Sequence, residues 1–353
     1  MKKNQLIILA ILFIGILQSC EKDPVVEIPG KYEEGIFVVN EGNFQQGNAS
    51  LSFIDKDLNS IENNVYFTVN ELQLGDQAQS ITFLEDKNYI VVSGSNKIEV
   101  TEGDTMERLA TIASDLEVPR YAVEIPGNKV LVSCWGDPSV ATDDYLALID
   151  AENDVVVSKI PVALGPEQLD LVENYLFVAH RGAWGTNNIV SVIDLFSLEV
   201  LKTIEVGDRP NSLVHDDNYL WVLSGGEPSW TGNETGGKLT KIDLTDFSVV
   251  QNFDFPQNVH PAHLSKTEDN LFYNIDNSIY KMNISDTALP SSSFMEYSGI
   301  MIYNMEANDG KIFITDAKDY QQEGDVIIYS ATDGTKIKEF TAGIIPGDLG
   351  FKN

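Results

Sequence analysis

The chain has 353 residues, a formal net charge of −31 at pH 7 and two cysteines. Its length fits two ordinary domains or one large β domain. So acidic a surface repels phosphate backbones and anionic membranes, which excludes nucleic acid as a partner. The acidity favours solubility of an exposed protein. Loop carboxylates leave calcium binding open, although no EF-hand spacing occurs.

Residues 1–19 predict a cleaved export signal. Lys2 and Lys3 form a positive region, and residues 6–17 form an apolar run that is too short to span a bilayer, which needs roughly 20 residues. The following residues, Gln18-Ser19-Cys20, resemble the end of the lipobox of bacterial lipoproteins. By that resemblance, Cys20 becomes the lipidated N-terminus of the mature protein. The alternative is an ordinary secretory signal with an incidental cysteine.

Residues 20–31 predict an acidic tether between the lipid and the fold. The stretch 21–30 reads EKDPVVEIPG, which is acidic and contains proline. It resembles the surface-export signals of Bacteroidetes lipoproteins, which implies display on the outer membrane with the lipid as the only membrane contact. If Cys20 carries lipid, Cys134 has no disulfide partner, so the fold must rely on its own core.

Residues 32–353 predict an all-β fold built from a repeat. Each copy is a turn residue followed by an apolar run such as NYLFV, and seven copies recur at a mean interval of about 46 residues, which is typical of propellers, solenoids or arrays. Val, Ile, Tyr, Phe and Thr dominate the runs, which predicts strands, and no useful amphipathic pattern supports helical repeats. The copies begin at Glu34, Asn88, Asn128, Asn174, Asn218, Asn270 and Gly310.

Each unit predicts four strands, which we letter a to d from the innermost outwards. Strand a follows a proline, as at Pro166, Pro210 and Pro261, and strand b is the apolar run. The chain starts at a strand b and ends at a strand a. Pairing of residues 347–351 with 36–40 would complete the first blade and remove exposed sheet edges. We therefore expect a closed seven-bladed β-propeller rather than an open solenoid.

The series NYLFV, VSVIDL and TIEVG between Asn174 and Asn211 resembles the YVTN or YncE-like propeller repeat. The likeness covers nearly all of the mature chain and is weakest in the sixth unit. The N-terminal block VNEGNFQQGNASLSFID is similar to a group of Bacteroidetes surface lipoproteins with this fold. Some of those proteins capture cobalamin, a corrinoid, and pass it to a TonB-dependent transporter. The resemblance therefore implies a corrinoid ligand and an outer-membrane transporter as partner.

The long loops between strands b and c predict a binding face, because loops on one rim of a rigid scaffold usually carry function. Three of the four tryptophans fall in these loops, whereas Trp221 lies inside a strand b and is expected in the core. Exposed aromatic rings suit a flat or ring-shaped ligand, although each could instead cap its own blade. The loop aromatics are Phe44, Trp135, Trp184, Trp230 and Tyr320.

The first residues of each strand a predict the lining of an axial channel. Ligand amides could bind to these polar side chains, or the side chains could simply solvate a water-filled channel. The positions after the proline or its equivalent are Gln79, Arg120, Glu167, Asn211, Ala262, Tyr303 and Gly347, followed by Ser80, Tyr121, Gln168, Ser212, His263, Asn304 and Asp348. The candidate ligand-binding residues among them are Arg120, Tyr121, Gln168, His263 and Tyr303, together with Arg181 and Arg209 from nearby connections.

The search for catalytic chemistry is mostly negative, so we expect no enzyme, cofactor or metal. His260 and His263 lie three residues apart in non-helical chain, which does not place both on one metal ion. Residues 232–238 lack the features of a phosphate loop, and no nucleophile elbow occurs. A surface scaffold for glycans or proteins remains an alternative function, and a propeller lyase or hydrolase would need a carboxylate or histidine converging at the channel mouth.

Overall fold

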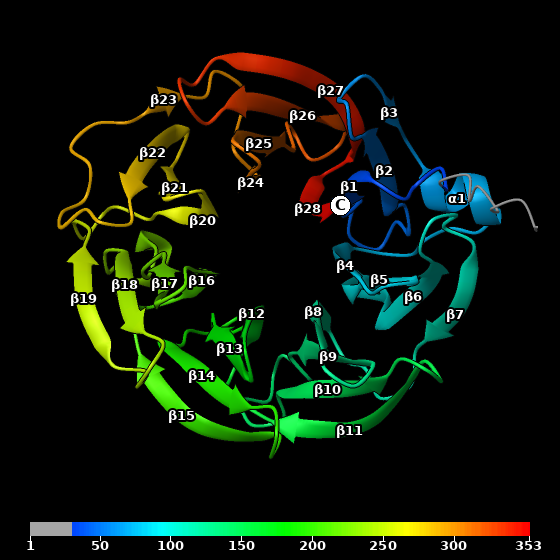
Figure 1. Cartoon of the computed structure of the whole chain (residues 1–353), viewed down its shortest axis with the longest axis horizontal. Helices are drawn as coiled ribbons and strands as arrows, with labels where there is room; N and C mark the ends of the chain where they lie inside the picture. The colour runs from blue at the N-terminus through cyan, green and yellow to red at the C-terminus, as the bar shows by residue number, and fades with distance from the viewer. Residues whose placement is uncertain (1–29) are drawn as a thin grey trace, which may run out of the picture.

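Seven four-stranded antiparallel sheets are arranged in a ring around a central axis in the computed structural model, which describes residues 30–353 (Figure 1). The chain therefore folds as a seven-bladed β-propeller, which confirms the predicted fold class. The predicted signal peptide at 1–19, Cys20 and most of the tether at 20–31 lie outside the described residues. No helix within residues 30–353 is long and apolar enough to cross a membrane.

We number the blades I to VII by the order of their b strands. Blade I contains β28 (Pro346–Lys352), β1 (Gly35–Asn40), β2 (Ser50–Asp55) and β3 (Ile61–Glu62). Blade II contains β4 (Ala78–Phe83), β5 (Lys87–Val92), β6 (Lys97–Glu102) and β7 (Arg108–Ile112). Blade III contains β8 (Pro119–Ile125), β9 (Lys129–Cys134), β10 (Tyr145–Asp150) and β11 (Val155–Pro161).

The remaining blades follow the same order from the channel outwards. Blade IV contains β12 (Pro166–Val172), β13 (Tyr175–His180), β14 (Ile189–Asp194) and β15 (Glu199–Glu205). Blade V contains β16 (Pro210–His215), β17 (Tyr219–Ser224), β18 (Lys238–Asp243) and β19 (Val249–Asp254). Blade VI contains β20 (Ala262–Thr267), β21 (Asn270–Ile275), β22 (Ser278–Asn283) and β23 (Met295–Glu296), and blade VII contains β24 (Asn304–Asn308), β25 (Lys311–Asp316), β26 (Glu323–Ser330) and β27 (Lys336–Ile344).

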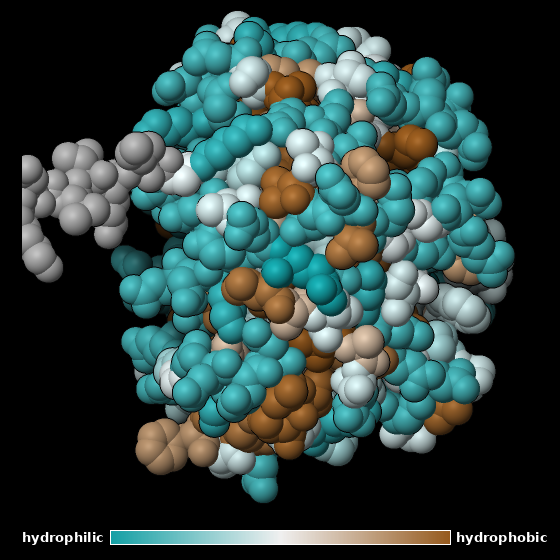
Figure 2. Space-filling view, turned by 90° about the vertical axis from the view of Figure 1, so that its right-hand side faces the viewer, coloured by the Kyte–Doolittle hydropathy of each residue, from teal (hydrophilic) through white to brown (hydrophobic). Residues whose placement is uncertain are grey.

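The burial of each strand explains its sequence pattern. Strands b are covered on both faces by neighbouring blades, so β1 is buried at all six residues and reads as a continuous apolar run. The outer strands face solvent, and in β15 Ile204 alone is buried. Figure 2 shows one side of the molecule, which is mostly hydrophilic, with separate apolar residues and a larger apolar area low in the view. This distribution agrees with the acidic composition of the chain.

Strand β28 closes the ring by pairing antiparallel with β1, as predicted, with Gly35 opposite Lys352 and Val38 opposite Leu349. Leu349 is buried in a cluster with residues of β1 and β2 and with Phe313 of blade VII. The closing strand therefore completes the sheet of blade I and also packs at its interface with blade VII. An open blade would leave β1 with unpaired backbone groups along the channel.

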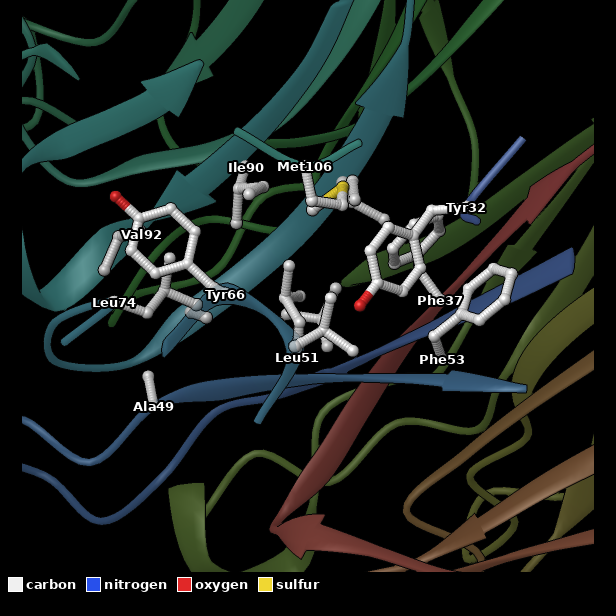
Figure 3. Packing of buried hydrophobic residues seen from close by; sticks show 14 residues of the cluster. Tyr32, Phe37, Ala49, Leu51, Phe53, Tyr66, Leu74, Ile90, Val92 and Met106 are labelled. Atoms are coloured by element: carbon white, nitrogen blue, oxygen red, sulfur yellow. The ribbon is translucent and has the colours of Figure 1, made fainter. Parts of the chain in front are cut away.

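The core consists of apolar layers between adjacent blades. Figure 3 shows the layer between blades I and II, where the ring centroids of Phe37 and Phe53 lie 4.9 Å apart. Tyr32 joins this layer from the segment before β1, with its ring edge-on to Phe53 at 5.2 Å and only 2% of the residue exposed. Lys352 at the end of the closing strand donates to the Tyr32 carbonyl oxygen. The start of the propeller is thus fixed beside its end.

Two blades have incomplete outer strands. In blade I, β3 has two residues and is followed by the helix α1 (Val65–Asn70), whose Val65 and Tyr66 are buried. In blade VI, β23 also has two residues, in the unit with the weakest repeat. Helix α1 was not among the predicted elements, because six residues are too few to show helical periodicity. Two short 3₁₀ helices, η1 (Ser93–Ser95) and η2 (Ser229–Thr231), lie in loops between strands b and c.

The inner half of the axial channel contains a pair of carboxyl groups, Glu306 on β24 and Asp348 on β28. Both line a cavity of about 280 Å³. Asn304 Nδ2 donates to Glu306 Oε1 at 3.2 Å, and the Ile81 backbone N–H donates to Asp348 Oδ2 at 3.3 Å. Burial is the main cause that raises the pKa of Glu306 to about 8, and the negative charge of Asp348 is the second cause. Burial also raises the pKa of Asp348, so two adjacent charges are avoided by protonation.

Ring closure predicts that Leu349→Ala lowers the free energy of unfolding by about 2–5 kcal/mol, because it leaves a cavity at the interface of blades I and VII. Urea denaturation followed by circular dichroism measures the change. Leu201→Ala on outer strand β15, where the leucine is 53% exposed, is the matched control and should shift stability by no more than about 0.5 kcal/mol. Equal losses in the two variants would show that β28 is not needed for stability.

The channel carboxyl pair predicts a pH-dependent stability that Glu306→Gln reduces, with the remainder coming from the raised pKa of Asp348. Glu306 has an ordinary pKa of 4.5 and a folded-state pKa of about 8, so the unfolded state ionises first and stability falls as pH rises between those values. The loss approaches about 1.4 kcal/mol per pH unit for one proton. Urea unfolding from pH 5 to 8 should show the variant matching the natural chain at pH 5 and exceeding it at pH 8.

The control for this experiment is Glu205→Gln, which removes an exposed carboxyl from outer strand β15. Its stability profile should run parallel to that of the natural chain across the same pH range. Parallel profiles for Glu306→Gln as well would contradict the assignment of a protonated carboxyl in the channel.

Candidate functional site

The candidate site is the mouth of the axial channel, on the face formed by the connections between strands b and c and between strands d and a. Each strand a begins there, and all seven contribute to a cavity of about 440 Å³. The larger part of its wall is polar, as expected for these positions. The cavity is lined by Glu41, Gln77, Gln79, Arg120, Tyr121, Glu167, Gln168, Arg181, Asn211, Ala262, His263, Tyr303, Asn304 and Gly347.

A β-bulge places most of these side chains. In six of the seven blades, the pairing between strands a and b shifts register at the start of strand a. In blade IV the shift falls between Pro166 and Leu169, which frees Glu167 and Gln168 from regular pairing. Bulges re-aim side chains at barrel rims and active sites, and here they occur at the channel mouth. The repeated irregularity thus serves to line the mouth.

Arg120 and Glu167 form a bidentate ion pair at the mouth. Arg120 Nε and Nη2 donate to Glu167 Oε2 and Oε1 at 3.2 and 2.8 Å. The guanidinium carbon of Arg120 lies 4.2 Å from the centroid of the Trp135 ring. Trp135 Nε1 also donates to Glu167 Oε2 at 3.0 Å. The three side chains therefore hold one another in a fixed arrangement, with the Arg120 charge neutralised by Glu167.

Trp135 is not an exposed rim residue, contrary to the sequence-based expectation. The residue is only 8% exposed, because its loop folds back and its indole N–H is used by Glu167 and by the Pro166 carbonyl oxygen. Its role is to position Arg120 and Glu167. The expectation of exposure is confirmed for Phe44, Tyr320 and the two other loop tryptophans. Trp221 is fully buried, as predicted.

Glu41 is a mouth residue that the sequence analysis did not single out. It begins the loop between strands b and c of blade I, and burial raises its pKa while the Tyr303 hydroxyl and the Arg120 charge oppose the shift. Gly347 leaves room for it, since a Cβ atom there would lie 2.7 Å from Glu41 Oε1. The acidic residue directly after a strand b could have indicated a residue of the mouth, but the sequence EGN is also typical of a turn.

His263 supplies a neutral imidazole to the mouth. Its Nδ1 lies 2.8 Å from Asn274 Oδ1, and Asn274 Nδ2 donates to the Asp276 carbonyl oxygen. The amide oxygen therefore accepts from His263, which places a proton on Nδ1. Burial lowers the pKa of His263, although the hydrogen bond that His263 donates to Asn274 opposes the shift. His260 contacts different groups, and residues 30–353 contain no set of three metal-ligating side chains.

Exposed aromatic side chains lie on both sides of the mouth. Phe44 and Tyr320 border a second cavity of about 610 Å³, which shares Glu41, Gln77 and Tyr303 with the first. Tyr303 and Tyr320 pack edge-to-face at 5.8 Å between ring centroids. These residues come from blades I and VII, whereas Trp184 and Trp230, 78% and 77% exposed, come from blades IV and V on the other side of the ring (Figure 1).

The predicted site residues thus fall into three groups. The mouth cavity is lined by Arg120, Tyr121, Gln168, Arg181, His263 and Tyr303. The neighbouring cavity is lined by Phe44 and Tyr320, together with Tyr303. Trp135, Trp184, Arg209 and Trp230 line neither cavity. Arg209 nevertheless contacts the loop that carries Arg181, because its Nη1 donates to the Gly185 carbonyl oxygen at 3.0 Å.

Many solved structures share this fold, and three of them illustrate the likeness. Hydrazine synthase of Kuenenia stuttgartiensis is 13% identical, with a TM-score of 0.64 and coverage of 90% of this chain and 100% of that chain. The computationally designed protein Ika8 is 10% identical, with a TM-score of 0.59 and coverage of 92% and 95%. The dihydro-heme d1 dehydrogenase NirN in complex with DHE is 12% identical, with a TM-score of 0.57 and coverage of 90% and 75%. At these identities the likeness shows the fold alone.

Sequence comparison places the chain in a family. No curated protein matches it significantly. A family model described as "Domain of unknown function (DUF5074)" matches residues 34–343, which span all seven blades from β1 to most of β27. The chain therefore belongs to the DUF5074 family.

Proposed function

We propose that the protein is a lipid-anchored lipoprotein of the outer membrane surface that captures a corrinoid, most directly cobalamin, and delivers it to a TonB-dependent transporter. It binds without catalysis. The observation that carries the proposal is the channel mouth, where a polar cavity of about 440 Å³ lies between exposed aromatic rings on two sides of the ring. The resemblance to YncE-like propellers and to cobalamin-capturing lipoproteins supplies the ligand class.

The chemistry of a corrinoid suits this mouth. A corrin ring is broad, with apolar faces and amides around its edge. Tyr121, Gln168, His263 and Asn304 offer donors and acceptors for such amides, and Trp184 offers a large apolar surface at a small entropic cost. The second cavity of about 610 Å³ adjoins the first, which gives the mouth room for a ligand larger than a single sugar.

The position of the chain ends supports anchoring together with binding. The segment before β1 and the end of β28 meet at the Lys352 contact to Tyr32, on the face of the a-to-b turns. The mouth lies on the opposite face. A lipid at Cys20 would therefore hold the protein by the face that does not bind ligand, and the mouth would stay open to the medium or to a transporter.

A surface scaffold that binds glycans is the second candidate, because exposed rings such as Trp184 and Trp230 also stack on sugars. A lyase or hydrolase has less support. Glu41, Glu167 and His263 all line the mouth cavity, but the Glu167 carboxylate is paired with Arg120. His263 Nδ1 is hydrogen-bonded to the amide of Asn274 and not to a carboxylate that could orient it as a general base.

Corrinoid capture predicts a saturable heat signal when cyanocobalamin is titrated into the protein by isothermal calorimetry. We expect one ligand per chain and a dissociation constant in the micromolar range or tighter, because a mouth that buries a broad ring gains apolar contact and hydrogen bonds together. The absence of heat at micromolar protein would refute the corrinoid assignment. Binding on a glycan array in its place would support the scaffold function.

The exposed rim predicts that Trp184→Ala combined with Trp230→Ala weakens corrinoid binding by roughly 10- to 100-fold, since exposed aromatic anchors carry much of an interface energy. Folding stability should change by no more than about 0.5 kcal/mol, because both side chains face solvent. Phe196→Ala is the matched control, since Phe196 is 98% exposed in a c-to-d turn on the opposite face. If Phe196→Ala weakened binding as much as the double variant, the mouth would not be the binding face.

A further inference from the structure

The arginines of this chain are concentrated at the channel mouth. Only four of the 23 basic residues are arginine, and three of them, Arg120, Arg181 and Arg209, lie at or beside the mouth. Within the described part of the chain, no lysine lines either mouth cavity. Arginine differs from lysine in its planar fork of donors, which matches the geometry of phosphate and carboxylate groups. The selective placement of arginine therefore indicates recognition of an anion.

Within residues 30–353, Arg120 alone of these three arginines forms an ion pair. Arg120 forms an ion pair with Glu167. Arg181 and Arg209 form no ion pair with any side chain of residues 30–353, in a chain whose net charge is −31. Carboxylates are abundant in this chain, yet none from the described part of it is paired with these two guanidinium groups.

The backbone brings Arg181 and Arg209 together. The Arg209 backbone N–H donates to the Asn187 carbonyl oxygen at 2.8 Å, and its Nη1 donates to the Gly185 carbonyl oxygen at 3.0 Å. Both acceptors belong to the loop that begins at Arg181. Burial lowers the pKa of Arg209, and the positive charge of Arg181 lowers it further to a smaller extent. The negative charge of Glu227 opposes this shift, although Glu227 forms no ion pair with Arg209. The Arg209 guanidinium group thus lies against the loop that carries Arg181, and Arg181 itself lines the mouth cavity.

We infer that Arg181 and Arg209 form an anion subsite for a phosphodiester group carried by the ligand at the mouth. The inference rests on the proposed function, because the rest of that ligand would lie over the mouth cavity. Guanidinium groups bind the oxygens of a phosphodiester monoanion through their fork of donors, and neither of these two groups is paired with a carboxylate of residues 30–353. Trp184, on the same loop and 78% exposed, offers an apolar wall beside it. Among corrinoids, cobalamin carries one phosphodiester in its nucleotide loop and cobinamide carries none.

The test compares cyanocobalamin with dicyanocobinamide by calorimetry on the natural chain and on Arg181→Gln and Arg209→Gln. We expect the natural chain to prefer cyanocobalamin by roughly 10-fold or more, and each variant to lose roughly 10- to 100-fold in cyanocobalamin affinity with no change for cobinamide. The matched control is Arg108→Gln, which removes the same group from outer strand β7 and leaves Glu99 paired with Lys97. It should keep the preference of the natural chain.

Two results separate this inference from the proposed function. Equal losses for cyanocobalamin and cobinamide in Arg181→Gln would overturn the anion subsite and leave corrinoid capture standing. If neither corrinoid bound the natural chain, the proposal of corrinoid capture would be wrong. The anion subsite would then be tested separately with diphenyl phosphate, a phosphodiester monoanion, whose binding broadens its ³¹P resonance. Broadening with the natural chain and with Arg108→Gln, but not with Arg181→Gln or Arg209→Gln, supports the subsite. No broadening with the natural chain overturns it.

Discussion

Ring closure is the constraint on which the rest of the structure depends. Six blades are built from consecutive strands, but blade I takes β28 and β1 from the two ends of the described chain. The entropy lost on joining distant segments grows slowly with chain length, so burial of residues such as Leu349 can offset it. Closure then fixes seven strands a around one axis. The mouth is formed by those seven strands, so its geometry depends on a contact between the chain ends.

The charged side chains of the channel have three different environments. At the mouth, Arg120 is paired with Glu167 and stacked on Trp135, so it is held in place before any ligand arrives. Deeper in the channel, protonation keeps Glu306 and Asp348 from facing each other as two anions. At the edge of the mouth, Arg181 and Arg209 form no ion pair with a carboxylate of residues 30–353. Pairing and protonation stabilise the scaffold, whereas an unpaired charge remains available to a ligand.

The sequence was sufficient to predict the ring, because each strand b is buried on both faces and repeats as an apolar run. It also predicted which positions line the mouth, since these follow the proline at the start of strand a. It did not predict the burial of Trp135, which depends on Glu167, a residue of the next blade. It also missed Glu41, whose place depends on a glycine about three hundred residues away. Such features arise from contacts between loops that no local pattern records.

The packing of Tyr32 has a mechanical consequence. Any pull on the chain before residue 30 first reaches this buried ring, which sits between blades I and II against Phe53. After Tyr32, β1 pairs antiparallel with β28, with Gly35 opposite Lys352. A force applied at Gly35 would therefore break the hydrogen bonds of this pair one after another, starting from Gly35. Tyr32 must leave its layer before that can start. The packing of Tyr32 therefore protects the β1–β28 pair from a force applied at the N-terminal side of the propeller.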